Sequence, residues 1–101
     1  MRIGRASETV RKCPLTFELG GEGGVLFFVD GKWFAARNRC PHQQFEKLHE
    51  GEVEGTIVTC PMHGWKFDLR SGLSVNAGGR LRMWNVVEKN GDVFVDRGEA
   101  Q

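Results

Sequence analysis

Hydrophobic residues in this chain recur in short runs that are separated by glycine-containing turns. The longest apolar run covers residues 25–29, and it is followed by Asp30-Gly31 and by a second strand-forming run over residues 32–36. An Asp-Gly pair tolerates the positive φ that the tight turns of β-hairpins require. The pattern therefore predicts a strand, a two-residue turn and a returning strand.

The same arrangement recurs near the carboxyl end, where Asn90-Gly91 separates residues 86–89 from residues 92–95. Runs rich in β-branched and aromatic residues predict further strands, whereas no segment shows a sustained helical period. These strands cover residues 16–19, 55–59, 65–69 and 81–84, and turn signals cover residues 20–24, 70–72 and 78–79. We expect an all-β fold, a small antiparallel sandwich or partly open barrel.

Chain length and composition limit what the protein can be. The 101 residues fit a single domain over 1–101, with 40% hydrophobic residues and a net charge of +1. The balanced charge predicts no nucleic acid and no membrane as partner, and no apolar run approaches the roughly 20 residues of a spanning helix. The three cysteines cannot close a disulfide framework, and two of them lie close to histidines. This pattern favours metal binding in the reducing cytoplasm.

Two short motifs carry the candidate chemistry. They are Cys40-Pro41-His42 and Cys60-Pro61-Met62-His63, the second followed by Gly64-Trp65. Seventeen residues separate His42 from Cys60, enough for the chain to leave one loop and return as a second, so we expect two metal-binding loops over about residues 38–72. Thiolate and imidazole together suit tetrahedral zinc or a mixed iron-sulfur centre. Zinc fingers usually pair Cys with Cys and His with His, whereas each pair here is mixed.

Cys-x-His, a gap, and Cys-x-x-His-Gly-Trp together resemble the Rieske ferredoxins and Rieske domains. The resemblance runs from about residue 25 to residue 95, and it implies the Rieske fold with one [2Fe-2S] cluster as cofactor. It further implies that Cys40 and Cys60 bind one iron of the cluster while His42 and His63 bind the other.

The resemblance also implies a low reduction potential. Replacing two thiolates by imidazoles gives potentials of roughly −150 to +300 mV. High-potential relatives carry an extra cysteine in each loop and hydroxyl donors to sulfur, but the corresponding positions here are Phe45, Met62 and Trp65, and the chain has no Tyr. Fewer donors leave the reduced cluster less stabilised. Two departures from the common ferredoxin pattern are the absence of Gly over residues 43–45 and of Pro over residues 75–80.

Iron that is ligated by protein side chains and bridging sulfides has no open position for a substrate, so we expect an electron carrier with no catalytic residues. The resemblance implies a ferredoxin that passes electrons from a flavin-dependent NAD(P)H reductase to a terminal oxygenase, a ring-hydroxylating dioxygenase, through transient contacts with both. The alternatives are a Rieske-like small subunit of assimilatory nitrite reductase, a zinc-stabilised interaction module and a fragment of a longer oxygenase subunit.

The remaining reactive and aromatic residues are assigned to the structure. Cys13 is expected to be a free, buried or half-buried thiol, and His49 a solvated loop residue. Trp65 is expected to shield the cluster. Packing in the core is predicted for the other large aromatic residues, Trp33, Phe34, Phe67 and Trp84.

Overall fold

The computed structural model describes residues 1–39, 46–61, 64–76 and 78–97. Its strands form a six-stranded sheet in the order β1-β9-β8-β4-β3-β2 and a three-stranded sheet in the order β5-β6-β7. The strands are β1 (Arg2–Arg5), β2 (Leu15–Leu19), β3 (Glu22–Val29), β4 (Lys32–Arg37), β5 (Glu52–Glu54), β6 (Ile57–Thr59), β7 (Lys66–Asp68), β8 (Met83–Lys89) and β9 (Asp92–Asp96). The helices are α1 (Ala6–Thr9) and two single 3-10 turns, η1 (Val10–Lys12) and η2 (Leu48–Glu50).

All strand pairs are antiparallel, and the expected all-β fold is confirmed. Both predicted hairpin turns are also confirmed. Asp30 and Gly31 have φ values of 52° and 76° between β3 and β4, and Asn90 and Gly91 have φ values of 53° and 80° between β8 and β9. Positive φ at both central residues gives a turn whose twist matches that of the flanking strands.

Several predicted boundaries are wrong. The predicted turn over residues 20–24 includes Gly23 and Gly24, which lie inside β3. Gly24 is needed there because a Cβ at this position would lie 2.4 Å from a ring atom of Trp84. The two separate strands predicted over residues 81–84 and 86–89 form the single strand β8, and neither β1 nor β5 was predicted.

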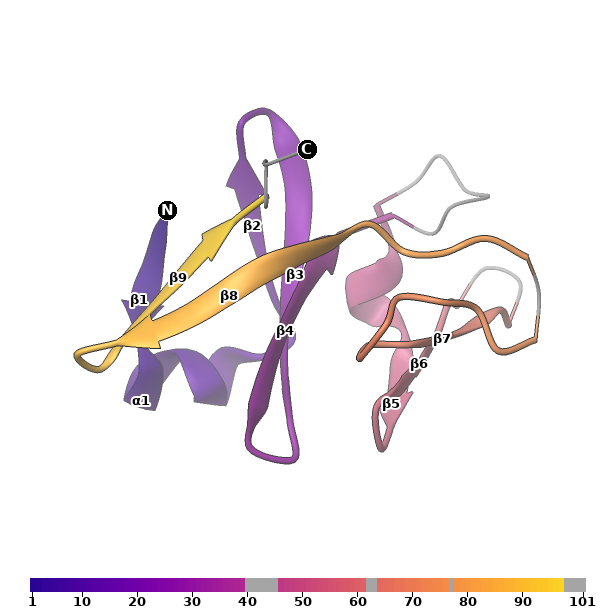
Figure 1. Ribbon diagram of the computed structural model, residues 1–101, viewed down its shortest axis with the longest axis horizontal. Coiled ribbons are helices and arrows are strands. Elements are labelled where there is room, and N and C mark those ends of the chain that lie inside the picture. The colour runs from indigo at the N-terminus through magenta and orange to yellow at the C-terminus, as the bar shows by residue number, and fades with distance from the viewer. Residues whose placement is uncertain (40–45, 62–63, 77, 98–101) are drawn as a thin grey trace.

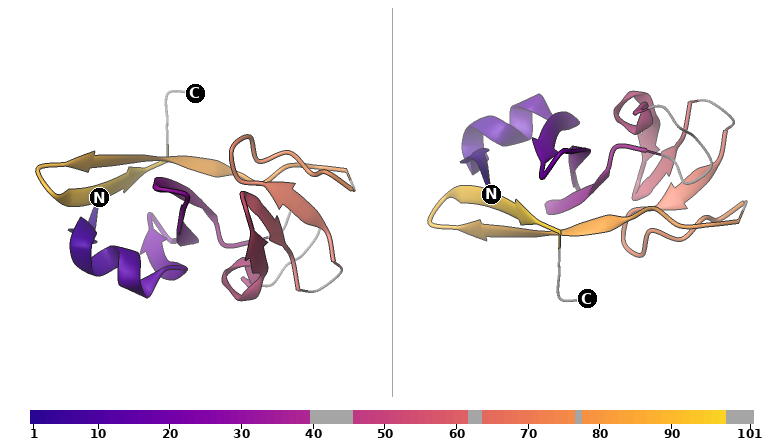
Figure 2. Two further views of the ribbon diagram at one scale, coloured as in Figure 1. Left: turned by 90° about the horizontal axis from the view of Figure 1, so that it is seen from below. Right: turned by 90° about the horizontal axis from the view of Figure 1, so that it is seen from above.

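The three-stranded sheet lies at the end of the molecule opposite β1 and α1 (Figure 1). Figure 2 shows β8 running along the molecule, with α1 and the three-stranded sheet on the same side of it. None of the helices in the described residues is long and apolar enough to cross a membrane. That residues 1–101 form one domain stays a prediction.

The core divides into two clusters of buried side chains. The inner cluster belongs to the six-stranded sheet and contains Leu26, Ala35, Trp84, Val93 and Val95. The bridging cluster joins the two sheets and contains Val25, Phe27, Ala36, Leu48, Val58, Cys60, Phe67, Leu69 and Leu81. The predicted packing role of the aromatic residues is confirmed, because Phe67 and Trp84 are buried and Trp33 and Phe34 pack against these clusters. The bridging cluster fixes the smaller sheet against the larger one.

Candidate metal centre

Cys60 follows β6 directly and is buried in the bridging cluster, with 1% of its surface exposed. The loop that starts at Cys60 is closed by two backbone hydrogen bonds. Cys60 N donates to Trp65 O at 2.7 Å, and Gly64 N donates to Cys60 O at 3.0 Å. Gly64 has a φ of 71°, a left-handed backbone conformation that glycine adopts without steric cost. The local structure therefore holds the Cys60 thiol at the base of a short closed loop.

The first metal-binding loop is held at its two described ends by Asn38 and His49. Asn38 is buried, and its Oδ1 accepts a hydrogen bond from His49 N at 2.8 Å. Its Nδ2 lies 2.9 Å from His49 Nδ1. Since the amide NH₂ can only donate, Nδ1 is the acceptor and a neutral His49 carries its proton on Nε2. Asn38 thus joins the residues on either side of the loop.

The prediction that His49 is a solvated loop residue is wrong. Its ring is only 33% exposed and forms the bond to Asn38 described above. The pairing spans eleven residues, so local sequence could not reveal it. Asn38 is a positioning residue that sequence reasoning missed, and its only sequence signal is an amide side chain two residues before Cys40.

The described ends of the two loops come close together. Leu48, in the turn η2 after the first loop, belongs to the same buried cluster as Cys60. A Cβ on Gly51 would lie 2.4 Å from Thr59 O, so the backbone at residue 51 passes directly beside the end of β6. This close approach brings the end of the first loop to the strand from which Cys60 emerges.

Of the four predicted ligands, only Cys60 lies within the described residues. Cys40, His42 and His63 lie outside them, as do Phe45 and Met62. Cys60 is free of any disulfide. A buried, uncommitted thiol in a closed loop fits a metal thiolate, and thiolate with imidazole is the donor set of a Rieske cluster. Trp65 is half-buried and packs against the bridging cluster. The shielding role expected of it stays a prediction.

A third segment, the residues after β7, lies beside the second loop. Ser74 pairs with Phe67 in an isolated bridge, and Val75 N donates to Lys66 O at 2.9 Å. Asp68 and Arg70 form an ion pair at the start of this segment, with Oδ2 and Nη2 2.8 Å apart. The hydrogen bonds from Arg70 hold the pKa of the Asp68 carboxyl well below its usual range.

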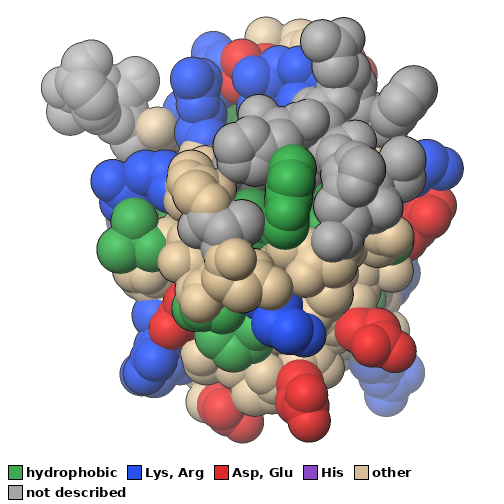
Figure 3. Space-filling view, turned by 90° about the vertical axis from the view of Figure 1, so that its right-hand side faces the viewer, with side chains coloured by type: hydrophobic (Ala, Val, Ile, Leu, Met, Phe, Trp, Pro, Cys, Tyr) green, Lys and Arg blue, Asp and Glu red, His purple; other side chains and the backbone are tan. Residues whose placement is uncertain are grey.

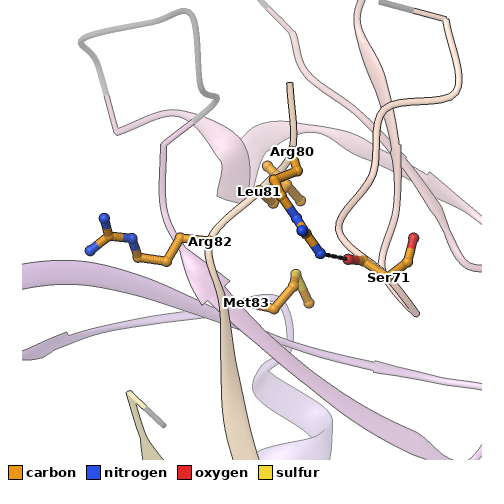
Figure 4. Close-up of a pocket in the computed structure, with 5 residues that line it drawn as sticks. All are labelled: Ser71, Arg80, Leu81, Arg82 and Met83. Carbon is orange, nitrogen blue, oxygen red and sulfur yellow. Dashed lines mark hydrogen bonds between the residues drawn. The ribbon is translucent and has the colours of Figure 1, made fainter. Parts of the chain in front are cut away.

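The surface around the site carries charges of both signs. Figure 3 shows basic, acidic and hydrophobic side chains together on the face that holds the three-stranded sheet. A hollow of about 470 Å³ nearby is lined by Ser71, Arg80, Leu81, Arg82 and Met83. Arg80 Nη2 donates to Ser71 O at 3.3 Å within it, while Arg82 points away from Ser71 (Figure 4). Among the described residues, those that line this hollow include no thiol, imidazole or carboxylate.

Comparison with known proteins adds independent findings. A profile of the Rieske [2Fe-2S] domain matches residues 1–89. The chain is 37% identical over 80 residues to the 3-phenylpropionate/cinnamic acid dioxygenase ferredoxin subunit of Photorhabdus laumondii, covering 76% of this chain and 75% of the relative. It is 34% identical over 88 residues to cholesterol 7-desaturase of Hemicentrotus pulcherrimus, covering 76% of this chain but only 19% of that protein.

A solved structure has the same fold. It is a complex of reduced oxygenase and oxidized ferredoxin in carbazole 1,9a-dioxygenase, and one of its chains matches with a TM-score of 0.81. The match has 24% sequence identity and covers 95% of this chain and 100% of that chain. At this identity the similarity supports the fold alone.

Proposed function

Because the chain belongs to the Rieske [2Fe-2S] domain family, we propose that it is the ferredoxin component of an aromatic-ring-hydroxylating dioxygenase system. Its cofactor is one Rieske-type [2Fe-2S] cluster, which supplies reversible one-electron transfer. The carrier accepts an electron from a flavin-dependent NAD(P)H reductase and donates it to a terminal oxygenase. The observation that carries this proposal is the 37% identity to a dioxygenase ferredoxin subunit, over three quarters of both chains.

The chain's own residues have three tasks in this function. Proposed ligands bind the cluster, the loop backbone keeps them in place, and packed side chains exclude water. Cys60 is buried at the base of its loop, and Trp65 packs against the core beside it. Gly64 is exposed, so a partner can approach the loop at this residue. The four proposed ligands are Cys40, His42, Cys60 and His63.

The two redox partners are proposed to bind transiently, since a shuttle must leave one partner before it meets the next. A complex of ferredoxin with oxygenase is known for carbazole 1,9a-dioxygenase. This chain covers only 19% of cholesterol 7-desaturase, and that match supports a different arrangement, in which the matching segment is part of a longer chain. Gel filtration of the isolated chain with a candidate oxygenase separates the two: a dissociable complex supports the carrier, whereas an inseparable one supports a subunit or domain.

The proposed ligands are tested by paired cysteine substitutions. We expect Cys60→Ser to abolish the reddish-brown colour, the acid-labile sulfide and the rhombic electron paramagnetic resonance signal of the reduced protein. Cys13→Ser is the matched control, because Cys13 is a second free thiol outside the bridging cluster. It should retain all three properties. A Cys60→Ser protein that holds a full complement of iron and sulfide would contradict the assignment.

The carrier role itself is tested by reconstitution. The purified holoprotein is combined with a candidate reductase, NAD(P)H, a terminal oxygenase and an aromatic substrate, and formation of the dihydrodiol is measured. We expect turnover to depend on the ferredoxin concentration and to vanish with the Cys60→Ser protein. A redox titration of the same sample should give a low midpoint potential, and a midpoint well above zero would contradict that part of the proposal.

A further inference from the structure

Asn76 lies between β7 and β8, and its side chain binds the loop that carries Cys60. Asn76 Oδ1 accepts a hydrogen bond from Lys66 N at 2.9 Å. Asn76 Nδ2 donates a hydrogen bond to Gly64 O at 3.2 Å. A single carboxamide therefore satisfies one donor and one acceptor of the same loop.

We propose that Asn76 is a positioning residue for the [2Fe-2S] cluster, holding residues 64–66 so that the adjoining loop retains the cluster in a fixed environment. The inference rests on the proposed function, because it presumes that this loop binds the cluster. It assigns Asn76 no contact with the cluster. Its effect passes through the backbone of the second metal-binding loop.

The backbone around Asn76 is itself anchored to that loop. Val75 N donates to Lys66 O at 2.9 Å, so the residue before Asn76 already pairs with β7. Asn76 N donates to Ser74 Oγ at 3.3 Å, and Ser74 pairs with Phe67. These bonds fix the position from which the carboxamide reaches Gly64 and Lys66.

Gly64 connects Asn76 to Cys60, because it forms a hydrogen bond with each of them. Gly64 accepts from Asn76 through its carbonyl oxygen and donates through its amide to Cys60 O at 3.0 Å. Gly64 also has a left-handed φ of 71°, which glycine adopts without steric cost. The Gly64 peptide is thus bonded on its carbonyl side to Asn76 and on its amide side to the Cys60 backbone.

The sequence gives the segment little other rigidity. Residues 75–80 contain no proline, so no ring restricts φ there. Asn76 is exposed, which means that burial does not immobilise it either. The two side-chain bonds of Asn76 therefore add to the backbone bonds of Val75 and Ser74, and among the described residues they join this segment to Gly64 and Lys66. An Asp in its place would keep the acceptor toward Lys66 N, lose the donor and place a carboxylate beside a carbonyl oxygen.

The test compares Asn76→Ala, Asn76→Asp and Asn85→Ala with the wild-type holoprotein. Asn85 is the matched control, an exposed asparagine of β8 whose Nδ2 bonds to Asp96 Oδ1 at 3.3 Å in the larger sheet. Three properties are measured: the anaerobic rate of cluster loss to a chelator, the g values of the reduced protein and its midpoint potential. We expect Asn76→Ala to lose the cluster roughly tenfold faster, the effect of losing one to two net hydrogen bonds.

Both Asn76 variants should also show shifted g values and a shifted potential, and Asn85→Ala should match the wild type in all three properties. If Asn76→Ala does not fold, the same three properties are compared between the isosteric Asn76→Asp protein and the wild type. Wild-type values in all three properties would overturn the inference while leaving the proposed function intact. Lower thermal stability with unchanged g values and potential would also overturn it, because that result describes a structural role only. A wild-type protein that takes up no iron would overturn both proposals.

Discussion

At the scale of single residues, Asp68 and Arg70 form a bidentate ion pair in the turn that follows β7. Asp68 Oδ1 accepts hydrogen bonds from Arg70 N at 3.0 Å and from Arg70 Nε at 3.1 Å, in addition to the bond between Oδ2 and Nη2. The Asp68 backbone oxygen also accepts from Gly72 N at 2.6 Å. The carboxylate thus stabilises the turn only while it is ionised.

Asp68→Asn is expected to lower the stability of the protein in a pH-dependent way. The folded-state pKa of Asp68 lies below that of an unfolded aspartate, so its stabilising contribution is fully present above about pH 4 and is lost as the pH falls through the folded pKa. Urea unfolding of wild type and variant between pH 2 and pH 7 measures the difference. It should be constant above about pH 5 and shrink in acid.

Arg70→Ala serves as the control for this charge interaction, because it removes the partner and leaves the Asp68 carboxyl in place. It should weaken the acid dependence of stability in the same pH range. Screening by salt should also reduce the effect, since the Arg70 side chain is 66% exposed. A difference between wild type and Asp68→Asn that stays constant down to pH 2 would contradict the argument.

The two described thiols received different assignments from the sequence. The expectation that Cys13 is a free, half-buried thiol is confirmed, whereas the assignment of Cys60 to the metal site stays a prediction. Burial raises the pKa of Cys13 to about 11, with a smaller opposing effect from a backbone hydrogen bond of Leu15. The roles of Asn38 and Asn76 could not be predicted, since their partners are eleven and ten to twelve residues away.

At the scale of elements, the sequence predicted those elements that depend on neighbouring residues, such as hairpins with short turns. The hairpins β3–β4 and β8–β9 followed from Asp-Gly and Asn-Gly turns, which need no information from elsewhere in the chain. β1 was missed because it pairs with β9 at the far end of the sequence, as in Arg2 opposite Phe94. β5 was missed because it has only three residues, all of them exposed, which is too short a run for alternation to be recognised.

The element that most directly supports the metal centre is the pair β6–β7, and Phe67 is its buried anchor. Phe67 lies opposite Val58, and neither side chain is exposed. We expect Phe67→Ala to lower the unfolding free energy by about 3–5 kcal/mol, since it removes buried surface and leaves a cavity. Urea unfolding of the holoprotein, followed by both visible absorption and tryptophan fluorescence, measures this loss.

Val87→Ala is the control for this prediction. Val87 belongs to β8 but is 51% exposed, so its truncation should change the unfolding free energy by no more than about 0.5 kcal/mol. Phe67→Ala should also release the cluster at a lower urea concentration than the wild type. Equal midpoints for Phe67→Ala and Val87→Ala would show that β7 does not depend on this packing.

At the scale of the whole molecule, the larger sheet and the metal-binding end have different sources of stability. The inner cluster is made by residues of the six-stranded sheet alone. The smaller sheet is attached through the bridging cluster, which includes the proposed ligand Cys60 itself. The sequence predicted the all-β class, but it could not predict this division of the core, since the two clusters arise from opposite faces of the same strands. Val25 and Phe27 face the bridging cluster, whereas Leu26 faces the inner one.

This division predicts that removing the cluster loosens one end of the molecule before the other. Without metal, the loop at Cys60 keeps its backbone bonds, its bonds to Asn76 and its packing but loses the ligand bonds, so the smaller sheet should open locally. Hydrogen exchange of anaerobic holoprotein and of apoprotein prepared with a chelator measures the effect. Protection should fall at Cys60 N and Leu69 N, whose acceptors Trp65 O and Thr56 O lie in this region. Protection should persist across β3, β4 and β8, and rebuilding the cluster should restore the lost protection. Uniform loss of protection in both sheets would mean instead that the molecule unfolds as one cooperative unit when the metal leaves.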